Sequence, residues 1–252
     1  MNSKVSVVTV TFNCQDVIEG TVRSVIDQDY DNVEYIVVDG GSKDDTLDIL
    51  NRYRSRFAYF ISEKDNGIFD AMNKAIIAST GDWILFLNAG DILASANVLS
   101  DIFSKPYGGR VGVVFGDVYF KRATGISLWK GKSFFLETGK VRSMGICHQA
   151  IFVRGGLAKS YLFDCKFRLA ADYNMMMQIF KAGYKFVYTG VVVSIYDLTG
   201  VSTYQCVRQF KEIYEICGNT SKSFFYYKGI LWNYYREFKL KICLLYTSDA
   251  AD

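Results

Sequence analysis

The sequence predicts an α/β fold with a mostly parallel, Rossmann-like sheet, helices on both faces of that sheet, and a small mixed region beside it. Three segments predict buried parallel strands because they are almost entirely apolar: Val5–Thr11, Val33–Asp39 and residues 83–87. Segments with a helical period separate these strands, and the alternation indicates βαβ units with right-handed crossovers. The fold class therefore follows from strand composition and from the order of the elements.

The first half of the chain alternates strand and helix. After the first strand, residues 16–28 have helical periodicity, and the second strand is followed by the turn-forming run Gly40-Gly41-Ser42. Residues 43–53 then predict a helix and residues 58–62 a short strand. The next helix, at 67–79, carries a stripe of small and apolar residues formed by Ile68, Met72, Ala75, Ile76 and Ser79. The apolar strand at 83–87 closes the series.

The second half is less regular and predicts the mixed region. Residues 111–120, 146–153 and 185–194 have the composition of strands, and residues 172–181 have the period of a helix. From about Ser202 the chain becomes helical and then strongly aromatic and basic.

These patterns predict one domain over residues 1–202 and a separate helical, aromatic and basic segment over residues 203–243. Residues 244–252 resemble the translation of a sequencing adapter, so we expect a non-native tail with no part in the fold.

Composition excludes several classes of protein. A formal charge of +3 is too small to favour nucleic acid, and we expect no nucleic-acid partner. Six cysteines without a C-x-x-C pair indicate free thiols in a reducing compartment. The first residues leave no room for a signal peptide, and no apolar run reaches the roughly 18 residues of a membrane span. We therefore expect a cytoplasmic protein.

Polar residues stand at the carboxyl ends of three of the predicted strands, either as the last residue or just after it. The carboxyl ends of parallel strands meet at one edge of a sheet, so Thr11, Asp39 and Asn88 are expected to lie together there. Open α/β sheets bind ligands beyond this edge. Asp91 comes just after the buried strand at 83–87, where a cation or a polar ligand would sit.

Four motifs in order resemble the family 2 glycosyltransferases, which have the GT-A nucleotide-diphospho-sugar transferase fold. They are the runs at residues 5–13 (VSVVTVTFN), 34–46 (EYIVVDGGSKDDT), 63–74 (EKDNGIFDAMNK) and 81–91 (GDWILFLNAGD), and the resemblance covers roughly residues 4–200. More narrowly, the chain is similar to bacterial enzymes that build surface polysaccharides of the colanic acid, capsule or O-antigen type. The resemblance implies a nucleoside-diphosphate sugar donor, expected to be a UDP-sugar, with inversion at the anomeric carbon.

The resemblance also implies which residues hold the donor. The expected donor-binding residues are Thr11, Asn13, Asp39, Asp65, Asp70, Asn73, Asn88 and Gly90. Local alternatives exist for several of them. Asp39 before two glycines is equally a turn former, Asp65 could be the N-cap of the helix that follows, and Asp70 and Asn73 could be only the polar face of that helix.

Asp91 is the expected metal ligand. The leaving diphosphate is highly anionic, and Mg²⁺ or Mn²⁺ held by carboxylate and phosphate oxygens would neutralise its charge. The family usually presents Asp-x-Asp at this point, whereas the run Asn88-Ala89-Gly90-Asp91 keeps only the last carboxylate. The alternative is that Asp91 is a solvated loop residue.

Inversion requires a base that removes the proton of the acceptor hydroxyl, and Asp172 matches the family position for it. Its alternative role is the N-cap of the helix over 172–181. His148 and Gln149 are expected to contact the acceptor or the diphosphate, although a lone histidine is often structural. Ser202 lies in a loop that resembles one closing over the diphosphate, or in an ordinary turn.

The expected activity is the addition of a single sugar to a hydroxyl of a surface-glycan or polyprenyl-linked acceptor. Processive relatives carry Q-x-x-R-W, whereas here Gln205 and Arg208 are followed by Gln209. Residues 222–241 combine aromatic and basic side chains, which favours either contact with an anionic membrane surface or a helix pair that covers the sheet. In the first case the protein would lie on the inner face of the cytoplasmic membrane.

Two other functions stay open at this stage. A sugar nucleotidyltransferase shares the sheet and the donor, but it needs a basic, glycine-rich loop after the first strand, and residues 12–16 (FNCQD) have neither feature. A relative that binds nucleotide sugars without turnover is conceivable because the first carboxylate of the metal motif is missing.

Overall fold

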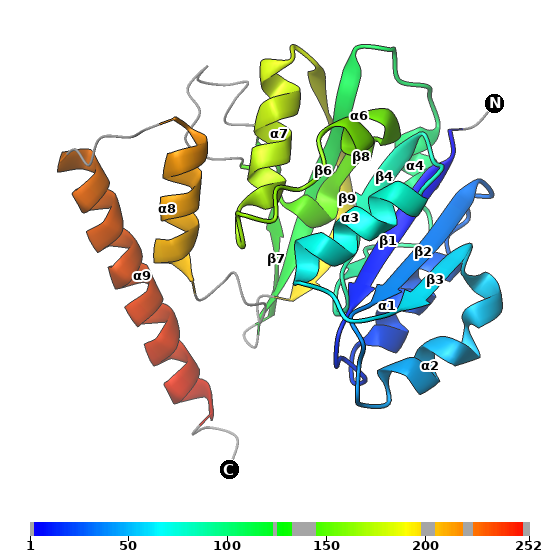
Figure 1. The fold of residues 1–252 in the computed structure, drawn as a ribbon, viewed down its shortest axis with the longest axis horizontal. Helices are drawn as coiled ribbons and strands as arrows, with labels where there is room; N and C mark the ends of the chain where they lie inside the picture. Colours follow the sequence, from blue (N-terminus) through cyan, green and yellow to red (C-terminus); the bar gives the residue numbers. More distant parts are fainter. Residues whose placement is uncertain (1–2, 123–124, 133–144, 198–204, 219–223, 249–252) are drawn as a thin grey trace.

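The computed structural model describes residues 3–122, 125–132, 145–197, 205–218 and 224–248, and it has the predicted α/β architecture (Figure 1). Within these residues one sheet contains nine strands. Eight of them follow the order β3-β2-β1-β4-β8-β6-β9-β5, and β7 pairs with β6. Helices cover both faces, as the alternation of strands and helices predicts.

The parallel half of the sheet contains β1 (Val5–Thr11), β2 (Val33–Asp39), β3 (Tyr59–Ser62) and β4 (Trp83–Phe86). The bounds of β1 and β2 are those predicted from the sequence. β1 lies between β2 and β4, and its register pairs Thr11 with Asp39. Leu87 and Ala89 continue the pairing with β1 through their amides, so the polar end of β4 comes to the same edge as Thr11 and Asp39.

The mixed half extends the sheet beyond β4 through one short strand and two long ones. β8 (Ile151–Arg154) is antiparallel to β4 and to β6 (Val111–Arg122), while β9 (Lys185–Asp197) runs parallel to β6. The prediction of a strand from residue 146 is wrong for its first part. Residues His148–Ala150 form a 3₁₀ turn, because the amide of Ala150 bonds to the carbonyl of Cys147 before the strand begins.

Short elements escaped the sequence patterns because they have too few residues for a period to show. They are β5 (Ile92–Leu93), α4 (Val98–Phe103), the 3₁₀ turn Arg54–Arg56, β7 (Gly125–Trp129) and α6 (Gly155–Ser160). The start of α6 needs glycine, since a Cβ on Gly155 would lie 2.3 Å from the carbonyl oxygen of Gly81.

The core lies in two layers, one on each face of the sheet. Alternate residues of the parallel strands serve opposite layers: Val8 and Val38 pack under α3 (Ile68–Ala78) and α7 (Ala171–Lys181). Val7 and Val37 pack on the other face, which α1 (Ile18–Ile26), α2 (Thr46–Arg52) and α4 cover. Because both faces are buried, these strands read as continuous apolar sequence.

Two helices stand beside the domain, at the side away from β3 (Figure 1). α8 (Cys206–Ile216) packs against α7, and α9 (Phe224–Ser248) packs against α8. Among the described residues, no helix is both long and apolar enough to cross a membrane.

A buried carboxylate fixes the amino end of the parallel strands. Glu34 on β2 accepts hydrogen bonds from Lys4 Nζ at 2.8 Å, Ser6 Oγ at 2.6 Å and the amide of Thr80 at 2.7 Å. Burial alone would raise the pKa of Glu34, but these hydrogen bonds outweigh it and lower the pKa to about 2. The ionised side chain therefore joins β1, β2 and the turn before β4.

This cluster predicts a stability loss that depends on pH. Replacing Glu34 by Gln should lower the free energy of unfolding by about 2 kcal/mol at pH 7. The folded-state pKa lies below the ordinary value of 4.5, so the stabilisation is present above pH 4.5 and disappears as the pH falls towards 2. Urea denaturation across this pH range should show wild type and E34Q converging. Asp31→Asn, at an exposed site, is the matched control and should change little; a cost of E34Q that is constant with pH would contradict this account.

Candidate functional site

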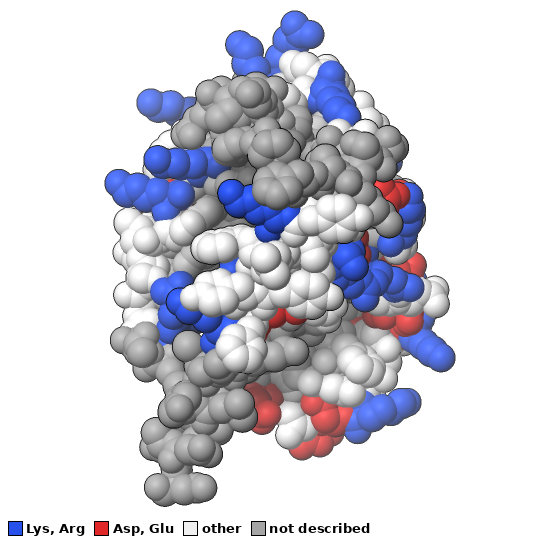
Figure 2. All heavy atoms as spheres, turned by 90° about the vertical axis from the view of Figure 1, so that its left-hand side faces the viewer, with Lys and Arg blue, Asp and Glu red and all other residues white. Residues whose placement is uncertain are grey.

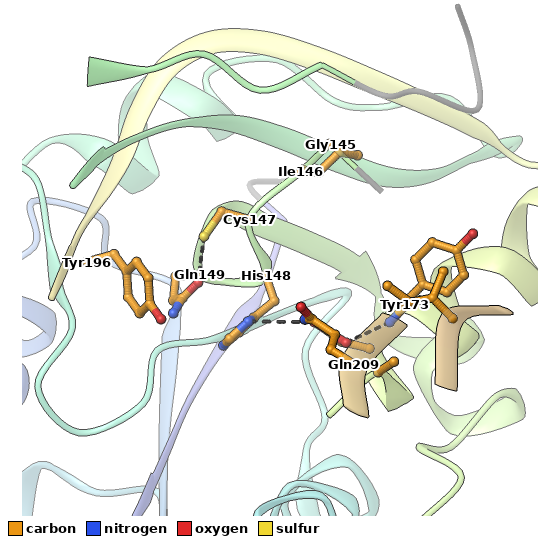
Figure 3. Close-up of a pocket in the computed structure, with 11 residues that line it drawn as sticks. Gly145, Ile146, Cys147, His148, Gln149, Tyr173, Tyr196 and Gln209 are labelled. Atoms are coloured by element: carbon orange, nitrogen blue, oxygen red, sulfur yellow. Dashed lines mark hydrogen bonds and ion pairs between the residues drawn. The ribbon is translucent and has the colours of Figure 1, made fainter. Parts of the chain in front are cut away.

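A cavity of about 260 Å³ opens where the turn before β8, the start of α7, the end of β9 and one face of α8 meet (Figure 3). Its walls are partly polar and partly apolar. The lining residues that bear on its chemistry are Cys147, His148, Gln149, Asp172, Tyr196 and Gln209. Residues from four separate parts of the chain therefore form one hollow.

Three polar side chains meet at the edge of this cavity. The amide Nδ2 of Asn88, just beyond β4, lies 3.3 Å from Nε2 of His148. The other ring nitrogen of His148, Nδ1, lies 3.6 Å from Oδ2 of Asp172. An amide Nδ2 is only a donor, so Nε2 is assigned as the acceptor and the ring proton as lying on Nδ1, which faces Asp172.

Burial shifts the pKa of both ionisable members of this group. It lowers the pKa of His148 below its ordinary value, and the negative charge of Asp172 only partly opposes the shift. It raises the pKa of Asp172, against the charge of His148 and the hydrogen bond from the amide of Tyr173. A carboxylate with a raised pKa beside a neutral imidazole has the properties of a general base.

Asp172 is the second residue of α7 and not its N-cap. The N-cap is Ala170, so the prediction that Asp172 caps this helix is wrong. Oδ1 of Asp172 accepts a hydrogen bond of 2.7 Å from the amide of the next residue, Tyr173. The carboxylate is thereby held in the first turn of α7, and Asp172 lines the cavity.

Glu212 on α8 does the capping instead, and the sequence analysis missed it. Its carboxylate accepts hydrogen bonds from the amides of Arg168 at 3.2 Å, Leu169 at 2.8 Å and Ala170 at 3.0 Å. These amides lie just before the first residue of α7, at the positive end of the helix dipole. Glu212 therefore fixes the segment that carries Asp172.

Asp91 is buried, so the alternative of a solvated loop residue is wrong. Gly90 has a φ of 96°, which a side chain rarely adopts, and this turn brings the amide of Asp91 to 3.0 Å from the carbonyl of Asn88. Thr21 on α1 holds the turn through bonds to the amide of Gly90 and the carbonyl of Asp91.

Asp91 and Asp172 lie on the same side of the molecule. Burial and then the charge of Asp91, with a smaller contribution from Asp172, raise the pKa of the Cys147 thiol to about 12. Both carboxylates therefore act on one side chain of the cavity wall. Asp91 is not itself part of that wall, and it lies next to the cavity rather than in it.

The donor set at the end of β4 fits a hard divalent cation. Oδ1 of Asn88 is buried and has no hydrogen-bond partner, so an oxygen ligand is available in the same turn as Asp91. In the described part of the chain, no group of three or more His, Cys, Asp or Glu side chains could hold a metal alone. Phosphate oxygens would have to complete the coordination.

The residues expected near the nucleoside form a rigid edge beyond β1 and β2. Asn13 has a φ of 46°, and its Oδ1 accepts the amide of Lys43. Thr11 lies next to it and contacts Cys14 through its hydroxyl. The carboxylate of Asp39 is fully buried and accepts hydrogen bonds from the amides of Gly41 and Ser42 and from two serine hydroxyls. The turn-forming role of Asp39 is therefore present, and its contact with a nucleoside stays a prediction.

The residues around α3 have mainly local partners. Asp65 accepts the amide of Gly67, which is itself the N-cap, so the prediction that Asp65 caps α3 is wrong. Asp70 accepts the amide of Asn66. Asn73 donates to and accepts from the backbone of Phe163, both at 2.9 Å, and so ties α3 to the segment before α7. Their role in donor binding stays a prediction.

Three further residues bear on the site: Gln149 and Ser202, which the sequence predicted, and Arg168, which it did not. Gln149 is buried and accepts the Cys147 thiol at 2.8 Å, whereas Ser202 lies outside the described residues. Arg168, which the sequence analysis missed, donates to the carbonyl of Asn66 and brings a positive charge beside Gly67. The residues around Arg168 could not predict this contact, because Asn66 is 102 residues away along the chain.

A parallel sheet with a polar edge, a cation-compatible turn after β4 and a buried carboxylate beside it define a class of α/β enzymes that bind anionic nucleotide ligands. Comparison with known proteins gives the family. The model of Glycosyl transferase family 2 matches residues 6–170, and the chain belongs to this family.

Known proteins are similar to this chain over much of its length. A glycosyltransferase of Mycobacterium tuberculosis, Rv1514c, whose name describes it as uncharacterized, is 35% identical over 178 residues, which cover 69% of this chain and 68% of the relative. The Escherichia coli enzyme WfaP, a UDP-Glc:alpha-D-GlcNAc-diphosphoundecaprenol beta-1,3-glucosyltransferase, is 34% identical over 39% of each chain.

Solved structures have the same fold. The mannosyltransferase PcManGT of Pyrobaculum calidifontis, in complex with GDP-Man and Mn²⁺, superposes with a TM-score of 0.68 at 19% identity, over all of this chain and 77% of PcManGT. This likeness supports the GT-A fold of the chain.

The Glu212 contacts predict a measurable coupling between α8 and α7. Replacing Glu212 by Gln removes the charge from three hydrogen bonds and should cost about 1–3 kcal/mol of stability. Amide hydrogen exchange should accelerate at Leu169 and Ala170. The matched control is Glu215→Gln on the same helix, which breaks an exposed ion pair with Lys166 and should cost no more than about 0.5 kcal/mol. Equal exchange rates in the two variants would contradict the capping role.

Proposed function

We propose that this glycosyltransferase moves one sugar from a nucleoside-diphosphate sugar, specifically a UDP-sugar, to a hydroxyl of a surface glycan or lipid-linked oligosaccharide, with inversion. The single observation that carries the proposal is the position of Asp172. Its carboxylate has a raised pKa, lines a cavity and lies 3.6 Å from His148, which is in turn hydrogen-bonded to Asn88 beyond β4.

The proposed reaction uses the chain's own groups in a defined order. An acceptor hydroxyl enters the cavity beside Asp172, and its oxygen attacks C1 of the donor sugar from the face opposite the diphosphate. The bond between C1 and the phosphate oxygen breaks, and the hydroxyl proton passes to Oδ1 or Oδ2 of Asp172. His148, neutral because of its lowered pKa, faces the carboxylate with Nδ1 and leaves its negative charge in place.

The turn after β4 would hold the leaving group. Asp91 and the free Oδ1 of Asn88 would bind Mg²⁺ or Mn²⁺ together with the phosphate oxygens of the donor. The ion would supply a positive charge that stabilises the departing diphosphate. Thr11, Asn13 and Asp39 would face the nucleoside, with Asp65, Asp70, Asn73 and Gly90 near the phosphates.

The acceptor side of the proposal rests on the cavity and on a relative. WfaP acts, by its name, on a sugar attached to diphosphoundecaprenol, which supports a lipid-linked acceptor here as well. Gln209, which stands where processive relatives carry tryptophan, lines the cavity. We infer single addition from this difference. Such an enzyme would work on the inner face of the cytoplasmic membrane.

Two other functions compete with sugar transfer: nucleotidyl transfer and nucleotide-sugar binding without turnover. Family membership argues against a sugar nucleotidyltransferase, and the loop after β1 lacks basic residues over 12–16. A relative that binds nucleotide sugars without turnover has the same pocket and differs only in catalysis. Measurement of turnover therefore separates it from the proposed enzyme.

Asp172→Asn provides the test. Without an acceptor, wild type should slowly hydrolyse its donor and release UDP, and EDTA should stop this reaction. D172N should keep donor binding, seen as a thermal shift with UDP-sugar and Mn²⁺, and lose at least about 100-fold in turnover. Asp91→Ala should lose both the turnover and the Mn²⁺-dependent part of the shift.

The pH dependence gives the second readout of the same variant. A base acts when it is deprotonated, so kcat/KM should rise with pH through a midpoint above the ordinary aspartate value of 3.8. D172N should lack this rise. Donor binding by wild type without hydrolysis or transfer would favour the binding-only relative, and D172N activity within a few-fold of wild type would exclude Asp172 as the base.

A further inference from the structure

α9 has one face that binds α8 and another that nothing in the described structure covers. On the inner face, Gly229 lets the ring of Phe210 approach so closely that a Cβ there would lie 2.3 Å from it. Tyr226 stacks near the same ring, and the amide of Val207 donates to Glu237 at 2.8 Å. These contacts fix which side of α9 faces the domain.

The opposite side is what we term the outer face of α9. Its aromatic and aliphatic residues are between 49% and 72% exposed. They are Tyr227, Leu231, Trp232, Tyr234, Tyr235 and Phe238. The prediction of a helix pair that buries these rings against the sheet is therefore wrong for α9. So much exposed aromatic surface on one helix indicates a surface that binds something.

The charges on α9 show what kind of partner fits. Within residues 226–239 the basic side chains are Lys228, Arg236 and Lys239, and the one acidic side chain, Glu237, is turned inward onto Val207. Lys239 lies over the ring of Tyr235 at 5.1 Å, and Trp232 lies 5.9 Å from the same ring. The outer face therefore mixes basic and aromatic groups and has no negative charge of its own in this range.

Figure 2 shows the side of the molecule that carries α9. Lys and Arg side chains flank a broad uncharged area, and most of the acidic side chains in view lie toward the right and the lower edge. Tryptophan and tyrosine place their rings at the level of lipid headgroups, and each nearby lysine or arginine attracts anionic lipid. A bilayer surface with anionic lipids can bind the aromatic rings and the basic side chains at the same time.

We propose that the outer face of α9 docks on the surface of a membrane that contains anionic lipids. The helix lies in the plane of the interface, with Leu231, Trp232, Tyr235 and Phe238 among the acyl chains and headgroups. Lys228 and Lys239 contact the lipid phosphates. In this arrangement α9 contacts one leaflet only, in keeping with a helix that is too polar, over its described residues, to cross a membrane.

The docking also orients the cavity. α8 lies between α9 and the catalytic domain, where its Gln209 and Ile213 line the cavity and its Glu212 holds the start of α7. A membrane-bound α9 therefore keeps the cavity at a fixed distance from the bilayer, with α9 and α8 between them. This part rests on the proposed function, since a lipid-linked acceptor then meets Asp172 without leaving the membrane.

Vesicle sedimentation tests the proposal with the full chain. The wild type should sediment with vesicles of phosphatidylcholine and phosphatidylglycerol and much less with phosphatidylcholine alone. Lys228→Gln combined with Lys239→Gln should weaken binding to the anionic vesicles about 30-fold. Trp232→Ser combined with Phe238→Ser should abolish it. In a Trp129→Phe background, the tryptophan emission should move to shorter wavelength on binding, because Trp232 is then the one exposed tryptophan and Trp83 is already buried.

Lys105→Gln combined with Lys159→Gln is the matched control, since it removes the same charge from exposed sites outside α8 and α9. This variant should bind like wild type. Absence of wild-type sedimentation, or equal weakening by both pairs of substitutions, would overturn the proposal. So would a concentration-dependent dimer that Trp232→Ser and Phe238→Ser dissolve. Donor hydrolysis in solution should be unchanged in the α9 variants, which separates this test from that of the proposed function.

Discussion

The approach of His148 to Asp172 is the interaction on which the site depends. Two ionisable groups line one cavity, and burial shifts their pKa values in opposite directions, down for the imidazole and up for the carboxylate. Each group limits the shift of the other. The outcome is a neutral histidine beside a carboxylate that takes up a proton more readily than an ordinary aspartate. Asn88 extends this contact to the polar edge of the parallel sheet.

The fold brings these residues together by joining two kinds of sheet. Parallel strands β1, β2 and β4 present their polar ends at one edge, and the antiparallel strand β8 lies against β4 so that the turn before it reaches the same edge. α7 then closes the cavity from the face of the sheet. α8 stabilises this arrangement, because one carboxylate on it, Glu212, binds the three amides that lead into α7. α8 is therefore part of the site.

Much of the fold could be predicted because strands that are buried on both faces of the sheet are continuous apolar runs in the sequence. β1 and β2 begin and end where their apolar runs do. The start of β8 could not be predicted, since apolar residues stand on both sides of His148 and Gln149 and only the hydrogen bond to the Cys147 carbonyl makes the turn. Glu212 and Arg168 escaped for a different reason. Their partners lie more than 40 residues away, and a sequence pattern records neighbours along the chain, not contacts across it.

Among the site predictions, the placement of the strand-end residues at one edge of the sheet was confirmed, and the helix caps were wrong. The residue types at strand ends indicated one polar edge, which the structure has, while the caps assigned to Asp65 and Asp172 were each wrong by two residues. A cap depends on backbone angles that composition does not determine. The buried Oδ1 of Asn88, which has no hydrogen-bond partner, adds an oxygen acceptor to the turn that carries the one carboxylate, Asp91.

The proposed mechanism requires the cavity around His148 to lie next to the bound donor and its cation. His148 is the one histidine in the chain, so its imidazole protons give a single resolved pair of NMR signals. Adding UDP with paramagnetic Mn²⁺ should broaden this pair strongly, and UDP with diamagnetic Mg²⁺ should only shift it. Asp91→Ala should lose the broadening. If the His148 signals stay sharp while Mn²⁺ and UDP are demonstrably bound, the donor binds elsewhere and the account is wrong.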